Sequence, residues 1–224
     1  MTVTWLGQAG FYIRYDGCGI LIDPYLSDSV AAIDPKKRRR IPVDRTLFEI
    51  KPDIMIFTHD HLDHYDPETA SAFLQKNDMI TVLSPVSVWP KVRKEGKNHN
   101  YVLFDQGTVW TEHGIRFTAV KAAHSDPHAI GVILDDGLKR IYFTGDTLYN
   151  EAIFADLPEN LEAVFVPVNG IGNNMNMTDA ANFVRRTKAK FAVPVHYGMF
   201  DNIDIRKFNL DNKKILTIYQ ETEL

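Results

Sequence analysis

Histidine and aspartate dominate the run His59-Asp60-His61-Leu62-Asp63-His64, which directly follows an apolar segment. Crowding imidazoles and carboxylates is unfavourable unless water solvates them or a cation binds their lone pairs. The preceding residues 53–57 are typical of a strand buried on both faces, and Asp66-Pro67-Glu68 is typical of a helix start. We therefore expect a fixed strand-to-helix corner that binds metal, rather than a histidine-rich surface loop.

Three further potential ligands lie within two residues of the ends of predicted strands. Taken singly, each has an ordinary explanation, because a histidine after a strand is commonly a hydrogen-bonded surface or core residue and Gly-Asp is a common turn. Sites gather where the strands of covered sheets end, so the coincidence favours a two-metal site. Imidazole and carboxylate ligands suit zinc, manganese or iron. The three are His124 after residues 115–122, Asp146 after residues 140–144 and His196 after residues 191–195.

The rest of the chain predicts strand meanders interleaved with helices. Such a pattern favours two mixed sheets that pack face to face, with helices outside. Pro194 favours an edge position for the last strand. No repeat, low-complexity segment or linker divides the chain, so residues 1–224 are expected to form one domain. Further strands are expected at 3–6, 11–15, 19–22, 80–83, 101–104, 109–111, 129–134 and 163–166, and helices at 67–76, at 86–94 and from a cap at Thr178 to about 188.

Charge and hydropathy exclude several classes of protein. A formal net charge of −4 and a pI near 6.0 argue against a general nucleic-acid binder. No apolar run approaches transmembrane length, and the first residues do not resemble a signal peptide. We expect a soluble, cytoplasmic protein without membrane contact. The single cysteine, Cys18, cannot form an internal disulfide and is expected to be a structural turn residue.

With these positions in place, the sequence resembles the metallo-β-lactamase superfamily. The hallmark of that superfamily is His-Xaa-His-Xaa-Asp-His, followed by a histidine, an aspartate and a histidine at later strand ends. Within it, the chain is most similar to the L-ascorbate-6-phosphate lactonase-like branch, although it lacks the extra segments of the longer prototype lactonase. The supporting stretches are residues 5–10, 21–24, 58–64, 143–147 and 194–196.

The resemblance implies a fold and a ligand set. The fold is an α/β four-layer αββα sandwich with the site on the edge between the sheets. The cofactors are two divalent metal ions, with zinc favoured by the superfamily and manganese allowed by the branch, which also suggests self-association as a homo-oligomer. The resemblance assigns His59, His61 and His124 to one ion, Asp63, His64 and His196 to the other, Asp146 to a bridging position and Asp23 to the orientation of a ligand imidazole.

Charge counting predicts the class of substrate. Two divalent cations, two ligating carboxylates and one hydroxide leave about +1, which favours an anionic substrate or a developing oxyanion. The expected activity is metal-dependent hydrolysis of a small anionic ester, lactone or phosphate ester. The resemblance suggests Asp63 as the catalytic residue that passes the proton of the attacking water to the leaving group.

Two loops and one histidine are predicted to contact the substrate. The basic run 36–40 contains Arg38, which suits bidentate contacts to phosphate or carboxylate. Residues 169–174 contribute Asn169 and Asn173, and His128 lies near His124 in the sequence. A solvated surface run and a simple turn before Thr178 are the ordinary alternatives for the two loops.

Three other function classes stay open. The same dinuclear chemistry supports a phosphodiesterase of nucleic acid or lipid, but the acidic net charge and the lack of an amphipathic docking helix weigh against it. An iron-dependent oxygenase can share the fold, although diiron members are expected to carry glutamate where this chain has His61. A metal-binding sensor or assembly subunit is the third class, and the complete ligand set weighs against it.

Overall fold

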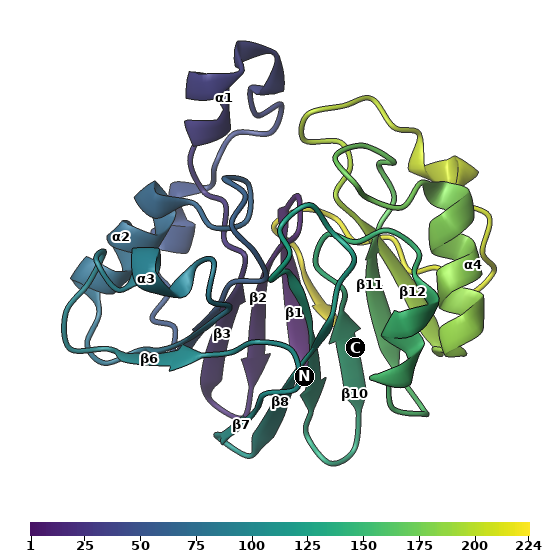
Figure 1. Ribbon diagram of the computed structural model, residues 1–224. Helices are drawn as coiled ribbons and strands as arrows, with labels where there is room; N and C mark the ends of the chain where they lie inside the picture. Colours follow the sequence, from purple (N-terminus) through teal and green to yellow (C-terminus); the bar gives the residue numbers. More distant parts are fainter.

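The computed structural model describes residues 1–224 and contains two mixed β-sheets (Figure 1). The arrangement confirms the predicted pair of sheets with helices outside. One sheet has the order β13-β1-β2-β3-β4-β5-β6 and comprises β1 (Thr2–Gly7), β2 (Gly10–Tyr15), β3 (Cys18–Ile22), β4 (Ile54–Ile56), β5 (Thr81–Ser84), β6 (Asn100–Leu103) and β13 (Glu221–Glu223). The other has the order β12-β11-β10-β9-β8-β7 and comprises β7 (Val109–Glu112), β8 (Ile115–Lys121), β9 (Ile130–Asp135), β10 (Arg140–Phe143), β11 (Ala163–Pro167) and β12 (Phe191–Val195).

Strand direction brings distant parts of the chain to one edge of the sandwich. β3, β4 and β5 are parallel, with Ile22 opposite Ile56 in the register. β10, β11 and β12 are parallel too, and β8 shares their direction because both β8 and β10 pair antiparallel with β9. Parallel strands end at the same edge of a sheet. The residues after β8, β10 and β12 therefore lie at one edge of the six-stranded sheet. The residues after β4 lie next to that edge, where the Thr58 carbonyl accepts from the Ile130 amide of the opposite sheet.

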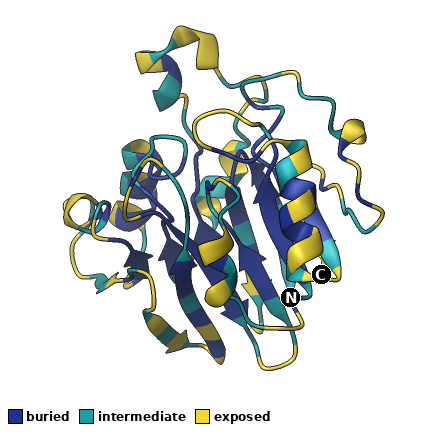
Figure 2. Ribbon diagram, turned by 45° about the vertical axis from the view of Figure 1, so that its right-hand side comes forward, coloured by how far each residue is buried: buried dark blue, intermediate teal, exposed yellow.

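Apolar side chains from both sheets form the central core. A cluster of 43 buried residues spans the two inner faces. Within it, Phe11 of β2 packs on Phe143 and Phe165 of the opposite sheet, with ring centroids 5.0 Å and 4.9 Å away. Figure 2 shows that burial is concentrated in the strands, while exposed residues follow the outer side of α4 (Met177–Thr187). The sheets are therefore held together by hydrophobic burial and aromatic contacts.

Helices cover the outer faces. A second cluster of 13 buried residues, including Phe57 and Phe73, joins α2 and α3 to the seven-stranded sheet. α4 packs on the six-stranded sheet through buried residues that include Ala180 and Phe183. None of the helices combines the length and apolar character that crossing a membrane requires. The helices are α1 (Ser29–Ile33), α2 (Pro67–Lys76), α3 (Trp89–Val92) and α4 (Met177–Thr187), with 3-10 turns η1 (Pro35–Lys37), η2 (Arg45–Glu49), η3 (Glu151–Ala155) and η4 (Ile205–Lys207).

Several local predictions are confirmed and others are wrong. α2 spans the predicted residues 67–76, with the Asp66 side chain accepting from the Thr69 amide, and Pro194 lies in β12, an edge strand as expected. Thr178 does not cap α4; the Asn176 side chain has the capping position and accepts from two backbone amides. Cys18 is the buried first residue of β3 rather than a turn residue, because the turn ends one residue earlier. The helix predicted at 86–94 is shorter, and β13 was not predicted.

Candidate metal centre

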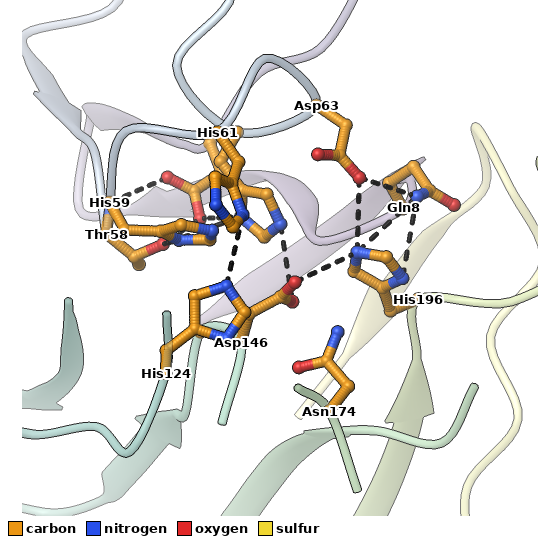
Figure 3. A network of polar contacts seen from close by, with 12 residues as sticks. Gln8, Thr58, His59, His61, Asp63, His124, Asp146, Asn174 and His196 are labelled. Atoms are coloured by element: carbon orange, nitrogen blue, oxygen red, sulfur yellow. Dashed lines mark hydrogen bonds and ion pairs between the residues drawn. The ribbon is translucent and has the colours of Figure 1, made fainter. Parts of the chain in front are cut away.

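The seven predicted ligands converge at one edge of the sandwich (Figure 3). Two groups, within which the potential donor atoms lie no more than 4.8 Å apart, contain all seven between them, and a third such group, Asp23, His59 and His64, overlaps both. This division matches the one that the resemblance implies, and it arises because β4, β8, β10 and β12 end together. The first group is His59, His61, His124 and Asp146, and the second is Asp63, His64 and His196.

Asp146 lies between the two groups. Its Oδ1 is 3.3 Å from Nε2 of His64, and its Oδ2 is 3.3 Å from Nε2 of His196. Asp146 thus shares the first group with three histidines and contacts both histidines of the second. Asp63 closes the second group, with Oδ2 3.2 Å from Nε2 of His196. The carboxylate of Asp146, which lies between the two groups, could therefore bind one cation on each side.

Buried donor atoms without partners test whether a cation fits. Nε2 of His59, Nε2 of His64 and Oδ1 of Asp146 are buried and make no hydrogen bond of acceptable geometry, although the last two atoms lie 3.3 Å apart. Leaving a buried polar atom unsatisfied costs about 1–3 kcal/mol. In addition, Nδ1 of His61 and Nε2 of His124 face each other at 3.1 Å. Unpaired nitrogen and oxygen atoms aimed at a common centre suit a divalent cation.

Hydrogen bonds at the rear of three imidazoles fix their orientation. Nδ1 of His64 is 2.8 Å from Oδ2 of Asp23, Nδ1 of His124 is 3.2 Å from the Asn173 carbonyl, and Nδ1 of His59 is 3.0 Å from Oγ1 of Thr58. A proton on Nδ1 leaves Nε2 as the free ligand atom. The contact of Asp23 with His64 agrees with the orienting role that the resemblance implies for Asp23.

Burial and neighbouring charged groups shift the pKa values of the side chains in the cluster. Burial, aided by the nearby His64, holds the pKa of His59 well below its usual value. Burial acts in the same direction on His196, but Asp146 and Asp63 outweigh it and raise its pKa to about 10. Although burial would raise the pKa of Asp146, His196 and His64 hold it well below the usual value. Protons thus balance charges that a metal ion would otherwise balance.

Gln8 is a site residue that the ligand search missed. It is almost fully buried, and its Nε2 donates to Oδ2 of Asp63 at 3.0 Å (Figure 3). The backbone carbonyl of Gln8 accepts from the backbone amide of His196 at 3.0 Å. Because β1 ends at Gly7, the same search for polar residues at strand ends would have found it. Gln8 thus links the N-terminal strand β1 to two residues of the second donor group, Asp63 and His196.

Three site residues have strained backbone. Gln8, Asp23 and His196 have positive φ angles of 49°, 42° and 59°. For residues other than glycine this conformation costs on the order of 1–3 kcal/mol each and persists where surrounding contacts impose it. Each of the three directly follows a strand, namely β1 at Gly7, β3 at Ile22 and β12 at Val195. The sharp turns direct these side chains into the cluster.

Asp126 is a second residue that the search missed. Its Oδ2 accepts from the amide of Asp60 at 3.0 Å, and its Oδ1 accepts from the amide of His128 at 2.8 Å. The carboxylate therefore joins the loop that carries His59 and His61 to the loop that carries His124. Its proximity to His124 in the sequence was the available signal.

Replacing Asp126 with alanine is expected to weaken metal binding about tenfold, because residues that support metal ligands commonly contribute 10–100-fold. Competition with a chromogenic chelator measures the affinity. Asp179→Ala, on the first turn of α4, is the matched control. Equal affinities for the Asp126 and Asp179 variants would show that the bridge between the two loops does not support the ligands.

A cavity of about 420 Å³ opens onto the cluster. The predicted substrate residue Asn169 lines it, with Nδ2 3.0 Å from Nδ1 of His196. Asn174, which belongs to the predicted loop 169–174 but was not singled out, also lines the cavity and accepts from the Thr147 amide through Oδ1. From the basic run, Lys37 rather than Arg38 borders the cavity.

The other predicted substrate contacts lie elsewhere. Arg38 is exposed, 3.8 Å from Asp28, and borders a separate cavity, because the η1 turn places Lys37 rather than Arg38 on the metal side. His128 is exposed and does not line the cavity, because the turn after Asp126 leads the chain away into β9. Asn173 is exposed and contacts His124 through its carbonyl instead of lining the cavity.

Comparison with known proteins agrees with this geometry. Residues 19–197 match the beta-lactamase superfamily domain. The UPF0173 metal-dependent hydrolase of Methanobrevibacter smithii is 30% identical over 224 residues, covering 91% of this chain and 84% of that protein. Igni18, a metallo hydrolase of Ignicoccus hospitalis, has a TM-score of 0.77 at 20% identity and covers 100% of this chain and 98% of that one. The metallo-beta-lactamase fold protein YhfI of Bacillus subtilis has a TM-score of 0.73 at 17% identity, covering 99% and 98% of the two chains. These two structures share the fold.

Proposed function

Because the chain belongs to the metallo-β-lactamase superfamily and to its UPF0173 metal-dependent hydrolase family, we propose that it is a dinuclear metal-dependent hydrolase. The position of Asp146 carries the proposal. One carboxylate contacts His64 through Oδ1 and His196 through Oδ2, while its own donor group contains three other histidines. Two adjacent donor groups that share a carboxylate are the arrangement that a pair of divalent ions requires.

The donor set supports zinc or manganese as the proposed metal. Nitrogen and oxygen ligands without thiolate favour zinc or manganese. His59, His61 and His124 would hold one ion and Asp63, His64 and His196 the other. Asp146 would reach both, because it belongs to the first group and contacts His64 and His196 of the second. Ions bound there would supply hydroxide at neutral pH and would polarise the attacked carbonyl or phosphoryl oxygen.

The proposed proton carrier is Asp63. Its carboxylate belongs to the second donor group and also borders the cavity. Gln8 donates to Oδ2 of Asp63, which orients the carboxylate. Asp63 can therefore take the proton of an attacking water and pass it to a leaving group in the cavity.

The substrate that we propose is a small ester, lactone or phosphate ester whose negative charge, present or developing, lies at the cluster. The cavity of about 420 Å³ is within the usual range for small molecules. A reaction of the lactonase-like branch belongs to this class. Lys37 is the one lysine or arginine that borders the cavity, which weighs against a nucleic-acid phosphodiester, because phosphate backbones are bound by several basic residues.

Elemental analysis combined with a hydrolysis screen tests the proposal. Gently purified protein is expected to contain two zinc or manganese ions per chain and to hydrolyse members of a panel of lactones, phosphomonoesters and phosphodiesters. Removing metal with a chelator should lower the Tm by roughly 5–10 °C, because a ligand at 100 times its Kd stabilises by about 2.7 kcal/mol. Re-addition of metal should restore both Tm and activity.

The same preparation distinguishes the alternatives. Undiminished hydrolysis by His61→Ala and Asp63→Ala variants would contradict the assignment, since both residues belong to the donor groups. Iron in the purified protein with oxygen uptake coupled to oxidation of a thiol would favour the oxygenase. Metal binding without activity on any of the three substrate classes would favour a sensor.

A further inference from the structure

The outer wall of the metal cavity is apolar. Its five hydrophobic residues are Val30, Ile33, Leu62, Ile171 and Phe200. Two of them are unusually exposed, Ile33 at 79% and Ile171 at 64%. Isolated exposed hydrophobic residues are common on protein surfaces, but apolar side chains gathered around a cavity with a few polar groups are typical of a ligand site.

These side chains come from segments that face each other across the cavity. Val30 and Ile33 belong to α1, which projects beyond the upper edge of the sheets in Figure 1. Ile171 lies on the loop after β11, and Phe200 on the loop after β12. None of the five residues belongs to, or packs against, either core cluster. Their hydrophobic surface is therefore not needed to hold the sheets together.

Charge around the outer wall is balanced rather than basic. Apart from the predicted metal ligands, the ionisable residues that line the cavity are Lys37, Asp34 and Asp201. Asp201 already accepts from two backbone amides, and Asp34 caps η1. One cation against two carboxylates does not favour a second negative charge here. Attraction for an anion is thus confined to the cluster end of the cavity.

We infer that the substrate carries an uncharged apolar group, alkyl or aryl, that packs against Ile33, Ile171 and Phe200 while its reacting carbonyl or phosphoryl group lies beside Asp63. The inference rests on the proposed function and narrows it to amphiphilic substrates. A burial of about 0.8 kcal/mol per methylene corresponds to roughly fourfold in affinity or kcat/KM. Substrates with longer chains are therefore favoured until the cavity is filled.

A chain-length series tests the inference. For the metal-loaded protein, kcat/KM on p-nitrophenyl acetate, butyrate and hexanoate should rise by roughly fourfold per methylene. A hexanoate ester with a terminal carboxylate should lose most of that gain. Titration calorimetry with butanoate, hexanoate and octanoate measures the same preference without turnover.

Variants of Ile33 and Ile171 test whether the apolar wall causes the preference for longer acyl chains. Ile33→Ser and Ile171→Ser should each reduce the ratio of kcat/KM for hexanoate to that for acetate about tenfold, by removing apolar contact with the longer chain. Leu138→Ser is the matched control, because Leu138 is 92% exposed in the turn between β9 and β10 and does not line the cavity. The control should leave both esters unaffected.

The outcomes separate the inference from the proposed function. Hydrolysis with no preference for longer chains would overturn the inference alone. Tighter binding of longer carboxylates without hydrolysis of any ester would contradict the proposed function and leave the apolar wall supported. An Ile33→Ser variant that changed the sedimentation coefficient but not the chain-length profile would show that a second copy covers this wall, and would overturn the inference.

Discussion

Asp146→Ala is expected to lower hydrolysis by on the order of 10³-fold, equivalent to roughly 4 kcal/mol in the activation barrier. Asp146 contacts both histidines of the second donor group and belongs to the first, so its loss affects both cations. The metal content should fall below the two ions expected per chain. Steady-state kinetics and elemental analysis of the same preparation measure both effects.

Two variants show whether charge or volume is responsible. Asp146→Asn keeps the volume of the side chain but removes its charge, and we expect it to share the loss of metal and activity. Asp16→Asn, in the exposed turn between β2 and β3, is the matched control and should behave as wild type. Full metal content and activity in Asp146→Asn would show that the carboxylate does not bridge two ions.

Asp23→Ala is expected to have the largest effect on stability. Its buried carboxylate accepts from the Thr58 amide at 2.8 Å, from the Thr58 hydroxyl at 2.5 Å, and contacts Nδ1 of His64 at 2.8 Å. Removing it leaves buried donors unpaired, which costs about 3–5 kcal/mol. For a chain of this size the Tm should fall by roughly 10 °C. Thermal unfolding monitored by circular dichroism measures the change.

An isosteric change at the same position separates orientation from stability. In Asp23→Asn the amide oxygen can still accept from Thr58, but the amide nitrogen faces Nδ1 of His64 and favours the tautomer with the proton on Nε2. We expect a smaller fall in Tm and a loss of metal affinity of about 10–100-fold. Asp53→Asn is the control, since Asp53 accepts from the Gly19 amide outside the donor groups. Unchanged affinity in Asp23→Asn would contradict the orienting role.

The sheets and most of the ligand set could be predicted from sequence because their signals are local. Apolar runs mark strands such as β4 and β12, and the residues that follow them have unusual chemistry for a loop. Because sites gather where the strands of covered sheets end, the residues that follow β4, β10 and β12 were expected to lie together, and the structure shows that each of these strands has a parallel neighbour. The same reasoning predicts α2 from Asp66 and Pro67.

The supporting contacts of the site depend on residues that are distant in the sequence. Gln8 reaches Asp63 because a left-handed turn after β1 redirects its side chain. Asp126 joins two ligand loops through the backbone amides of Asp60 and His128, and no side-chain pattern indicates that. β13 is only three residues long and pairs with β1 from the opposite end of the chain. Neither hydropathy nor spacing predicts such contacts.

The sequence by itself indicated metal binding, because imidazoles and carboxylates coincide at the ends of several apolar strands, although each of them alone has an ordinary explanation. Only the tertiary structure decided how those residues divide between the two donor groups and which residues surround them. It placed Asp146 between two donor groups, placed Lys37 rather than Arg38 at the cavity, and gathered Ile33, Ile171 and Phe200 into one apolar wall. The physical reason is that donor chemistry belongs to each residue, whereas the direction of a side chain depends on backbone turns and on packing between distant segments.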